Sequence, residues 1–133
     1  MNAKMVKLAH VANLLCKDCP FVLFAWFSIL ENNDRKNGQS NLNLSVYISA
    51  DAGFLVSIER IFRVFKASFP DSACDVTLLN HADAATRYKA VHGACMFSRA
   101  GCASEYRQFV RQAHLDYRIL RAHQRRRGLI END

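Results

Sequence analysis

The sequence contains few residues that break secondary structure and no apolar run long enough to span a membrane. Only 2 of its 133 residues are Pro and 5 are Gly, and neither a repeat nor a low-complexity linker appears. The longest apolar run, residues 21–27, is far shorter than the roughly 18 residues that a membrane-spanning helix needs. We therefore expect no membrane insertion.

A secretory signal is also missing from the N-terminal residues. Lys4 and Lys7 are followed by a mixed stretch that contains His10 and Asn13. A signal peptide needs about 7–15 apolar residues at this place. We therefore expect a cytoplasmic protein.

Apolar and aromatic residues are plentiful. They make up 50% of the chain, with 9 Phe, 4 Tyr and 1 Trp, which excludes an intrinsically disordered chain. A length of 133 residues is typical of one domain with its own core. We predict a single domain over residues 1–133, made of an N-terminal helix (1–19), a sheet-containing core (21–98) and a basic C-terminal helix (104–127).

Acidic residues are scarce toward the C-terminal end. Residues 99–127 hold 8 Arg against Glu105 and Asp116, so this segment carries a net charge of +6, the same as the whole chain. Such a segment indicates an acidic partner or nucleic acid. The alternative is a solvated helix face that keeps the protein soluble.

The five cysteines are an odd number, and without an export signal we expect reduced thiols. Cys16 and Cys19 form a Cys-x-x-Cys pair. A zinc site would need a second pair of similar spacing, and Cys95 and Cys102 are too far apart to supply it. We interpret the cysteines as structural or incidental.

Hydrophobic periodicity predicts the order helix, strand, strand, helix, strand, helix, strand, helix. Helical spacing is found in residues 5–16, 54–69 and 82–91 and in a final helix capped by Ser104. Strand patterns are found in residues 21–27, 42–48, 75–79 and 95–97. The polar residues 31–41 indicate a loop. This order is typical of an α+β fold, a small mixed β-sheet with helices packed on one side.

The helix over residues 54–69 is predicted to be amphipathic. One apolar stripe is expected to face the core, with charged residues opposite it. The residues of this predicted core stripe are Leu55, Ile58, Phe62, Phe65 and Phe69.

Several short segments occur in an order that resembles a known family. The first strand ends in Trp26-Phe27-Ser28, and Asn41-Leu42-Asn43 follows after a gap of twelve residues. Asp75-Val76-Thr77 lies on a later strand, and residues 85–90 precede a His-Gly pair at 92–93. This order and spacing resemble the minimal nucleotidyltransferases, small relatives of the DNA polymerase β superfamily.

In that family a strand ends in Gly-Ser, Asp-x-Asp follows on the next strand, and a third carboxylate lies on a later one. The residues around 106–109 and 115–118 resemble the C-terminal helix of the subgroup encoded beside HEPN-domain ribonucleases. The resemblance covers about residues 21–120 and implies a polymerase β-like nucleotidyltransferase fold with a long C-terminal helix.

The resemblance assigns site positions. Asn41, Asn43 and Asp75 stand at the metal-binding positions, and Phe27 and Ser28 stand at the phosphate-binding turn. Nucleotidyl transfer uses two divalent metals held by carboxylates, and the two asparagines remove two negative charges. Asp75 would be the one metal carboxylate left, and we expect the Phe27 side chain to lie where phosphates should.

We therefore predict a pseudoenzyme, without a cofactor unless the site still takes ATP and Mg²⁺. Simpler interpretations stay open for each position. Asn41 and Asn43 can be polar residues that flank a strand, and Asp75 a turn residue. Arg87 and Lys89 can belong to a solvated helix face instead of binding phosphate.

The resemblance implies an antitoxin-like subunit that binds and neutralises a HEPN-type ribonuclease toxin, in a homo- or hetero-oligomer. We expect the contact surface to be the arginine face of the last helix, formed by Arg107, Arg111, Arg118, Arg121 and Arg125. One alternative is an active Mg²⁺-dependent enzyme that transfers AMP from ATP to a protein tyrosine. A second is nucleic-acid binding through the same helix, whose affinity would fall steeply with salt.

Overall fold

The computed structural model describes residues 3–30 and 41–128. The loop predicted over residues 31–41 lies outside the described residues except for Asn41, which begins a strand. The helices are α1 (Ala3–Asp18), α2 (Phe54–Ser68), α3 (Ala84–Val91), the 3₁₀ turn η1 (Ala100–Cys102) and α4 (Ala103–Arg126). The strands are β1 (Val22–Leu30), β2 (Asn41–Ile48), β3 (Ala73–Leu78) and β4 (Ala94–Ser98). The predicted order of long helices and strands is confirmed.

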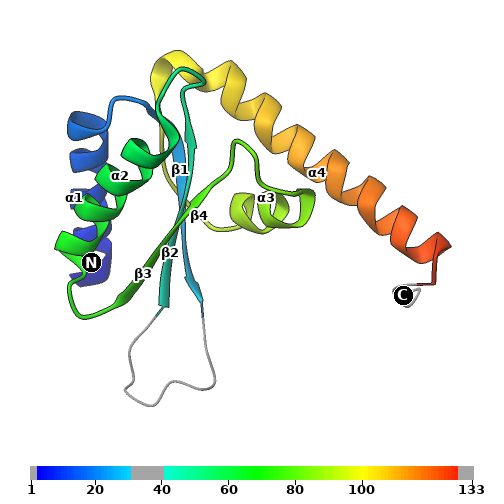
Figure 1. The fold of residues 1–133 in the computed structure, drawn as a ribbon, viewed down its shortest axis with the longest axis horizontal. Helices are drawn as coiled ribbons and strands as arrows, with labels where there is room; N and C mark the ends of the chain where they lie inside the picture. The colour runs from blue at the N-terminus through cyan, green and yellow to red at the C-terminus, as the bar shows by residue number, and fades with distance from the viewer. Residues whose placement is uncertain (1–2, 31–40, 129–133) are drawn as a thin grey trace.

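The four strands form one mixed sheet in the order β3-β2-β1-β4. Strand β1 pairs antiparallel with both β2 and β4, whereas β2 and β3 are parallel. Parallel neighbours need a crossover connection, and α2 provides it between β2 and β3 (Figure 1). The predicted α+β class, mixed sheet and long C-terminal helix are confirmed.

Helices cover both faces of the sheet, so the prediction that they pack on one side is wrong. Figure 1 shows α1 and α2 on one side of the strands and α3 and α4 on the other. The first core contains Leu44 and Val46 of β2 against α1 and α2, and the second contains Phe24 and Trp26 of β1 with Phe109 of α4. The physical reason is β1, whose continuous apolar run presents hydrophobic side chains to both faces.

Helix α2 buries only part of the stripe that the periodicity predicts. Phe65 and Phe69 of that stripe are buried, as predicted, together with Ser57 and Ile61, whereas Leu55 is 77% and Phe62 40% exposed. The helix carries apolar residues around most of its circumference, and periodicity alone does not determine which stripe packs against the sheet.

The start of α4 also differs from the prediction. The helix begins at Ala103, and its N-cap residue is Cys102, without a side-chain capping bond. Ser104 is therefore inside the helix and not its cap. At the start of α3 the N-cap residue is Asp83, whose carboxylate accepts a bond of 2.8 Å from Thr86 N. Hydrogen bonds from the Thr86 side chain and from its backbone N–H lower the pKa of the Asp83 carboxyl.

Gly93 lies in the connection from α3 to β4, where the backbone comes very close to that of β1. A Cβ atom at this position would lie 2.8 Å from the Phe27 carbonyl oxygen and 3.2 Å from that of Ala90. Both obstacles are backbone atoms, which cannot move aside as a flexible side chain can. Lack of a side chain is therefore what this position requires.

We predict that Gly93→Ala destabilises the protein by about 2 kcal/mol, because overpacking at a rigid site costs about 1–3 kcal/mol. Urea unfolding of the two chains measures the difference. Gly101→Ala is the matched control, since no atom lies within 4 Å of the Cβ added there. Equal losses in both variants would contradict the assignment.

Candidate functional site

Three of the candidate site residues lie in one row across the sheet. In the strand register, Ser28 of β1 is paired with Asn43 of β2, and Asn43 is paired with Asp75 of β3. Asn41 lies two residues from Asn43 and therefore on the same face of β2. Positions 28, 43 and 75, far apart in the sequence, are thus neighbours in space.

Hydrogen bonds occupy both ends of the Asn43 amide. Its Oδ1 accepts a bond of 3.0 Å from the Thr77 hydroxyl, and its Nδ2 donates one of 3.0 Å to the Ser45 hydroxyl. Ser45 is 3% exposed, so the amide is attached to a buried partner. A hydroxyl can either donate or accept, so a carboxylate at this position could accept bonds from both neighbours.

A small pocket lies over this row, between the sheet and α3. Its volume is about 110 Å³, and its lining residues are Ser28, Asn43, Ser45, Thr77, Thr86, Lys89 and Ala90. Pockets that enclose small ligands usually measure about 300–1,000 Å³. The part of the site that the structure describes is therefore too small to enclose a whole nucleotide.

A two-metal site is lined by negatively charged carboxylates, whereas the lining of this pocket carries a positive charge. Lys89 is the one charged residue in the lining, and Asp75 is exposed in the next strand of the row. Mg²⁺ prefers anionic oxygen ligands. Over the described ranges, no group of three or more His, Cys, Asp or Glu side chains is arranged to hold a metal. The donor set does not fit a pair of Mg²⁺ ions.

The Phe27 side chain does not lie at the site, contrary to the sequence prediction. It is 6% exposed and belongs to the core on the α1 and α2 face. Its ring meets that of Phe65 edge-on, with centroids 6.3 Å apart. Successive side chains of a strand point to opposite faces, so Ser28 faces the pocket and Phe27 points away from it.

Arg87 has a structural role that sequence reasoning missed. Its Nε donates a bond of 2.9 Å to the Leu79 carbonyl, and its Nη2 donates one of 2.6 Å to the Asn80 carbonyl. The guanidinium also lies 5.2 Å from the centre of the Phe109 ring. Arg87 therefore holds α3 and α4 to the end of β3, which neither a phosphate-binding nor a solvated position would do. Nothing in the local sequence signals these contacts.

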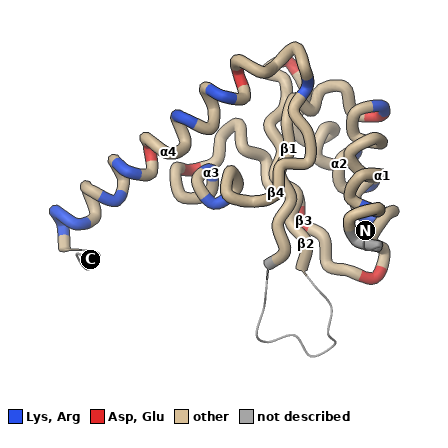
Figure 2. The backbone as a smooth tube through the Cα atoms, turned by 180° about the vertical axis from the view of Figure 1, so that it is seen from behind, with Lys and Arg blue, Asp and Glu red and all other residues tan. Residues whose placement is uncertain are grey.

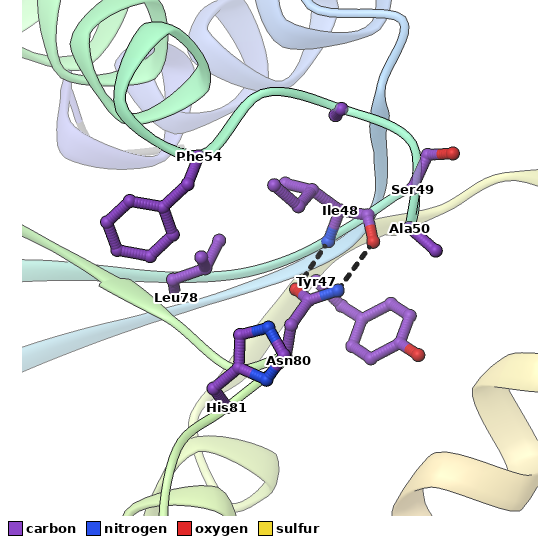
Figure 3. Close-up of a pocket in the computed structure, with 9 residues that line it drawn as sticks. Tyr47, Ile48, Ser49, Ala50, Phe54, Leu78, Asn80 and His81 are labelled. Carbon is purple, nitrogen blue, oxygen red and sulfur yellow. Dashed lines mark hydrogen bonds between the residues drawn. The ribbon is translucent and has the colours of Figure 1, made fainter.

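A separate pocket of about 250 Å³ opens where β2 and β3 end and α2 begins. Figure 3 shows the Asn80 amide inside it, paired with the backbone of Ile48. The Ile48 N donates to Asn80 Oδ1 at 2.9 Å, and Asn80 Nδ2 donates to the Ile48 carbonyl at 2.7 Å. This amide extends the pairing of β2 beyond the last residue of β3, so we assign it a structural role.

The five predicted contact arginines lie on one face of α4. At about 100° per residue, they fall within a sector of about 80°. Glu105 and Asp116 lie about 160–180° from Arg107 around the same helix. Figure 2 shows basic positions along α4 as far as its C-terminal end. Of the five arginines, Arg121 is half-buried and the others are exposed.

The aromatic residues of α4 face the body of the protein. Tyr106 stacks on Trp26 with ring centroids 5.5 Å apart, and Tyr117 stacks on Tyr88 at 3.9 Å. Arg121 lies 6.0 Å from the centre of the Tyr117 ring, but that ring is stacked on Tyr88. The rings of α4 therefore do not form an open stacking platform for single-stranded nucleic acid.

The five cysteines are all free thiols. Cys16 is exposed and Cys19 buried, and burial raises the pKa of the Cys19 thiol. Burial likewise raises the pKa of Cys74. Raised pKa values favour the unreactive thiol over the thiolate, which agrees with a structural interpretation of these two residues.

The mixed four-stranded sheet, with α2 as its crossover helix and the long helix α4, forms a nucleotidyltransferase-like fold. No helix within the described part of the chain is long and apolar enough to cross a membrane. Neither a protein-family model nor a curated protein matches the sequence.

Solved structures with a similar fold include chains of a toxin–antitoxin pair. A chain of the MntA–HepT complex matches with a TM-score of 0.65 at 14% identity, over 91% of this chain and 92% of that one. A chain from the complex of tri-AMPylated Shewanella oneidensis HEPN toxin with MNT antitoxin has a TM-score of 0.65, 13% identity and coverages of 91% and 92%. A chain of the toxin–antitoxin with AMP-PNP has a TM-score of 0.64, 15% identity and coverages of 89% and 92%. This chain has the fold of minimal nucleotidyltransferase antitoxins.

We predict that Arg87→Met lowers the free energy of unfolding by about 2 kcal/mol, because unpaired carbonyl groups cost about 1–3 kcal/mol each when buried. Lys89→Met on the same helix is the control, since Lys89 is exposed. Urea unfolding provides the comparison. If the two variants lose equal stability, Arg87 does not hold the helices to β3.

Proposed function

We propose that this chain is a catalytically degenerate nucleotidyltransferase-fold protein that acts as an antitoxin-like subunit and binds a HEPN-type ribonuclease toxin. The observation that carries the proposal is the row formed by Ser28, Asn43 and Asp75. We interpret this row, with Asn41 beside it, as the counterpart of a nucleotidyltransferase site in which amides replace two of the carboxylates. A site that keeps its shape but loses its metal ligands is consistent with a protein that acts by binding.

The similar structures support the class of partner in this proposal. They include an MNT antitoxin in complex with a HEPN toxin, which gives the class of partner. One of them is an MntA–HepT mutant with two Asp→Glu substitutions two positions apart, the spacing of Asn41 and Asn43 here. With amides in place of this carboxylate pair, the proposed metal site has about two fewer negative charges to balance the charge of the metal ions.

Two substitutions test the loss of catalysis. We predict that the natural chain shows no Mg²⁺-dependent ATP binding in calorimetric titration, and that Asn41→Asp/Asn43→Asp gains it, because two carboxylates restore anionic ligands. The hydroxyls of Ser45 and Thr77 can both donate to the new carboxylate, so the variant is expected to fold. Thermal unfolding checks this point.

The main alternative is an active Mg²⁺-dependent enzyme that transfers AMP from ATP to a protein tyrosine. The specific observation in its favour is the tri-AMPylated toxin in one of the similar complexes. Under this alternative the natural chain binds ATP in a Mg²⁺-dependent manner and labels a HEPN protein with AMP. Either result would contradict the pseudoenzyme proposal and leave the binding proposal to be tested separately.

We propose the arginine face of α4 as the surface that contacts the toxin. Its four exposed arginines and half-buried Arg121 have no acidic residue within their sector of the helix. Such a stripe complements an acidic surface and speeds association at low salt.

The contact surface is tested with a HEPN-type ribonuclease, which is sought first among the products of the neighbouring genes. We predict that Arg111→Glu/Arg118→Glu weakens binding by about tenfold or more, mostly through a slower association rate. Lys17→Glu/Arg60→Glu, on α1 and α2, is the control because it changes the net charge equally. Surface plasmon resonance at two salt concentrations measures both rates.

Equal weakening in both variants would indicate a general charge effect and would contradict the proposed surface. Tight, strongly salt-dependent binding to RNA, lost in Arg111→Glu/Arg118→Glu while binding to the HEPN protein is absent, would favour the nucleic-acid alternative.

A further inference from the structure

Helix α4 extends well beyond the helix on which it packs. It has 24 residues and α3 has 8, which correspond to lengths of about 36 and 12 Å. The stack of Tyr117 on Tyr88 joins the two helices. Beyond it, Figure 1 shows the C-terminal part of α4 leaving α3 and the sheet behind, and none of residues 118–126 is buried. This part of the helix is therefore accessible to a partner.

The outer face of α4 carries two large apolar side chains. Leu115 is 45% and Ile119 59% exposed. Measured around the helix from the buried residue Ala113, Leu115 lies at about 160° and Ile119 at about 120°, so both point away from the sheet. Ala122, also exposed, follows one turn later. The three residues have the i, i+4, i+7 spacing of a helix that binds in an apolar groove.

Arginines border this apolar row on one side only. Arg111 lies about 40° and Arg118 about 60° from Leu115 around the helix, both in the same direction. On the other side of the row, Gln112 Nε2 donates a bond of 2.8 Å to the Asp116 carboxylate. The row therefore has one basic edge and one edge whose polar groups already bind each other.

We infer that Leu115 and Ile119 insert into an apolar groove of the toxin, and that Arg111 and Arg118 lie along an acidic rim of that groove. This inference rests on the proposed function and adds the apolar groove to the partner surface. Charge and apolar contact act on different steps of binding. Long-range attraction speeds association, whereas apolar side chains buried in a pocket slow dissociation, because they must return to water when the partner leaves.

The chemistry of this face favours an acidic protein groove over other occupants. Leu115 and Ile119 have no ring on which a nucleic-acid base could stack. A second copy of the chain would bring its own arginine face against this one, and like charges across a contact oppose association. A groove that is apolar at its floor and acidic along one rim complements both features of the helix.

The experiment measures, by surface plasmon resonance, the rates at which variants bind the same HEPN-type ribonuclease. Leu115→Ala/Ile119→Ala removes the apolar side chains and keeps the helix, because Ala is the best helix former. We expect dissociation to become about tenfold faster or more, with the association rate changed by less than about twofold. Arg111→Glu/Arg118→Glu is expected to act mostly on association.

Two further variants serve as controls. Leu115→Met/Ile119→Met keeps apolar side chains of similar volume, so its dissociation rate is expected to stay within about threefold of the natural one. Leu55→Ala/Val56→Ala, on α2, also truncates two exposed apolar residues, which are 77% and 63% exposed, and is expected to change neither rate. Far-UV circular dichroism checks the helix content of every variant.

No binding by the natural chain would overturn the proposed function and this inference together. Binding that depends on the arginines but is unchanged by Leu115→Ala/Ile119→Ala would overturn the inference alone. So would equally fast dissociation in the α2 control. Self-association of the natural chain that Leu115→Ala/Ile119→Ala abolishes would place a second copy on this face and would also overturn it.

Discussion

Strand β1 is apolar on both of its faces, and the remaining elements are arranged to cover it. Phe24 and Trp26 point to one side and Ala25 and Phe27 to the other, and all four are buried. A strand of this kind is stable only between two layers. The two helix pairs, α1 with α2 and α3 with α4, therefore follow from this one segment. The pocket between the sheet and α3 exists because α3 belongs to the second layer.

On the proposed interpretation, the candidate site keeps the fold of a nucleotidyltransferase while its chemistry changes. The register of three strands brings positions 28, 43 and 75 together, and this register depends on the buried rows beside them. The site residues themselves contribute neutral hydrogen bonds, such as those of Asn43 with Ser45 and Thr77. Replacing carboxylates by amides removes ligands for a cation but keeps polar groups that satisfy the neighbouring strands. The architecture therefore does not need the charge that catalysis would need.

The proposed toxin contact on α4 is defined by charge. The outer face of α4 carries arginines within one sector of the helix, so its association with a partner depends on long-range charge and on salt.

The order of helices and strands, the alternation of β2 and the two-residue spacing of Asn41 and Asn43 were all readable in the sequence, because these are local properties of neighbouring residues. The tertiary structure decided which part of α2 is buried, since apolar residues surround much of the helix and packing against α1 and β3 selects among them. It also decided that Phe27 points away from the site and that Arg87 binds the carbonyls of Leu79 and Asn80. Side-chain direction relative to distant segments depends on strand register and layer order, which arise only when the whole chain is packed.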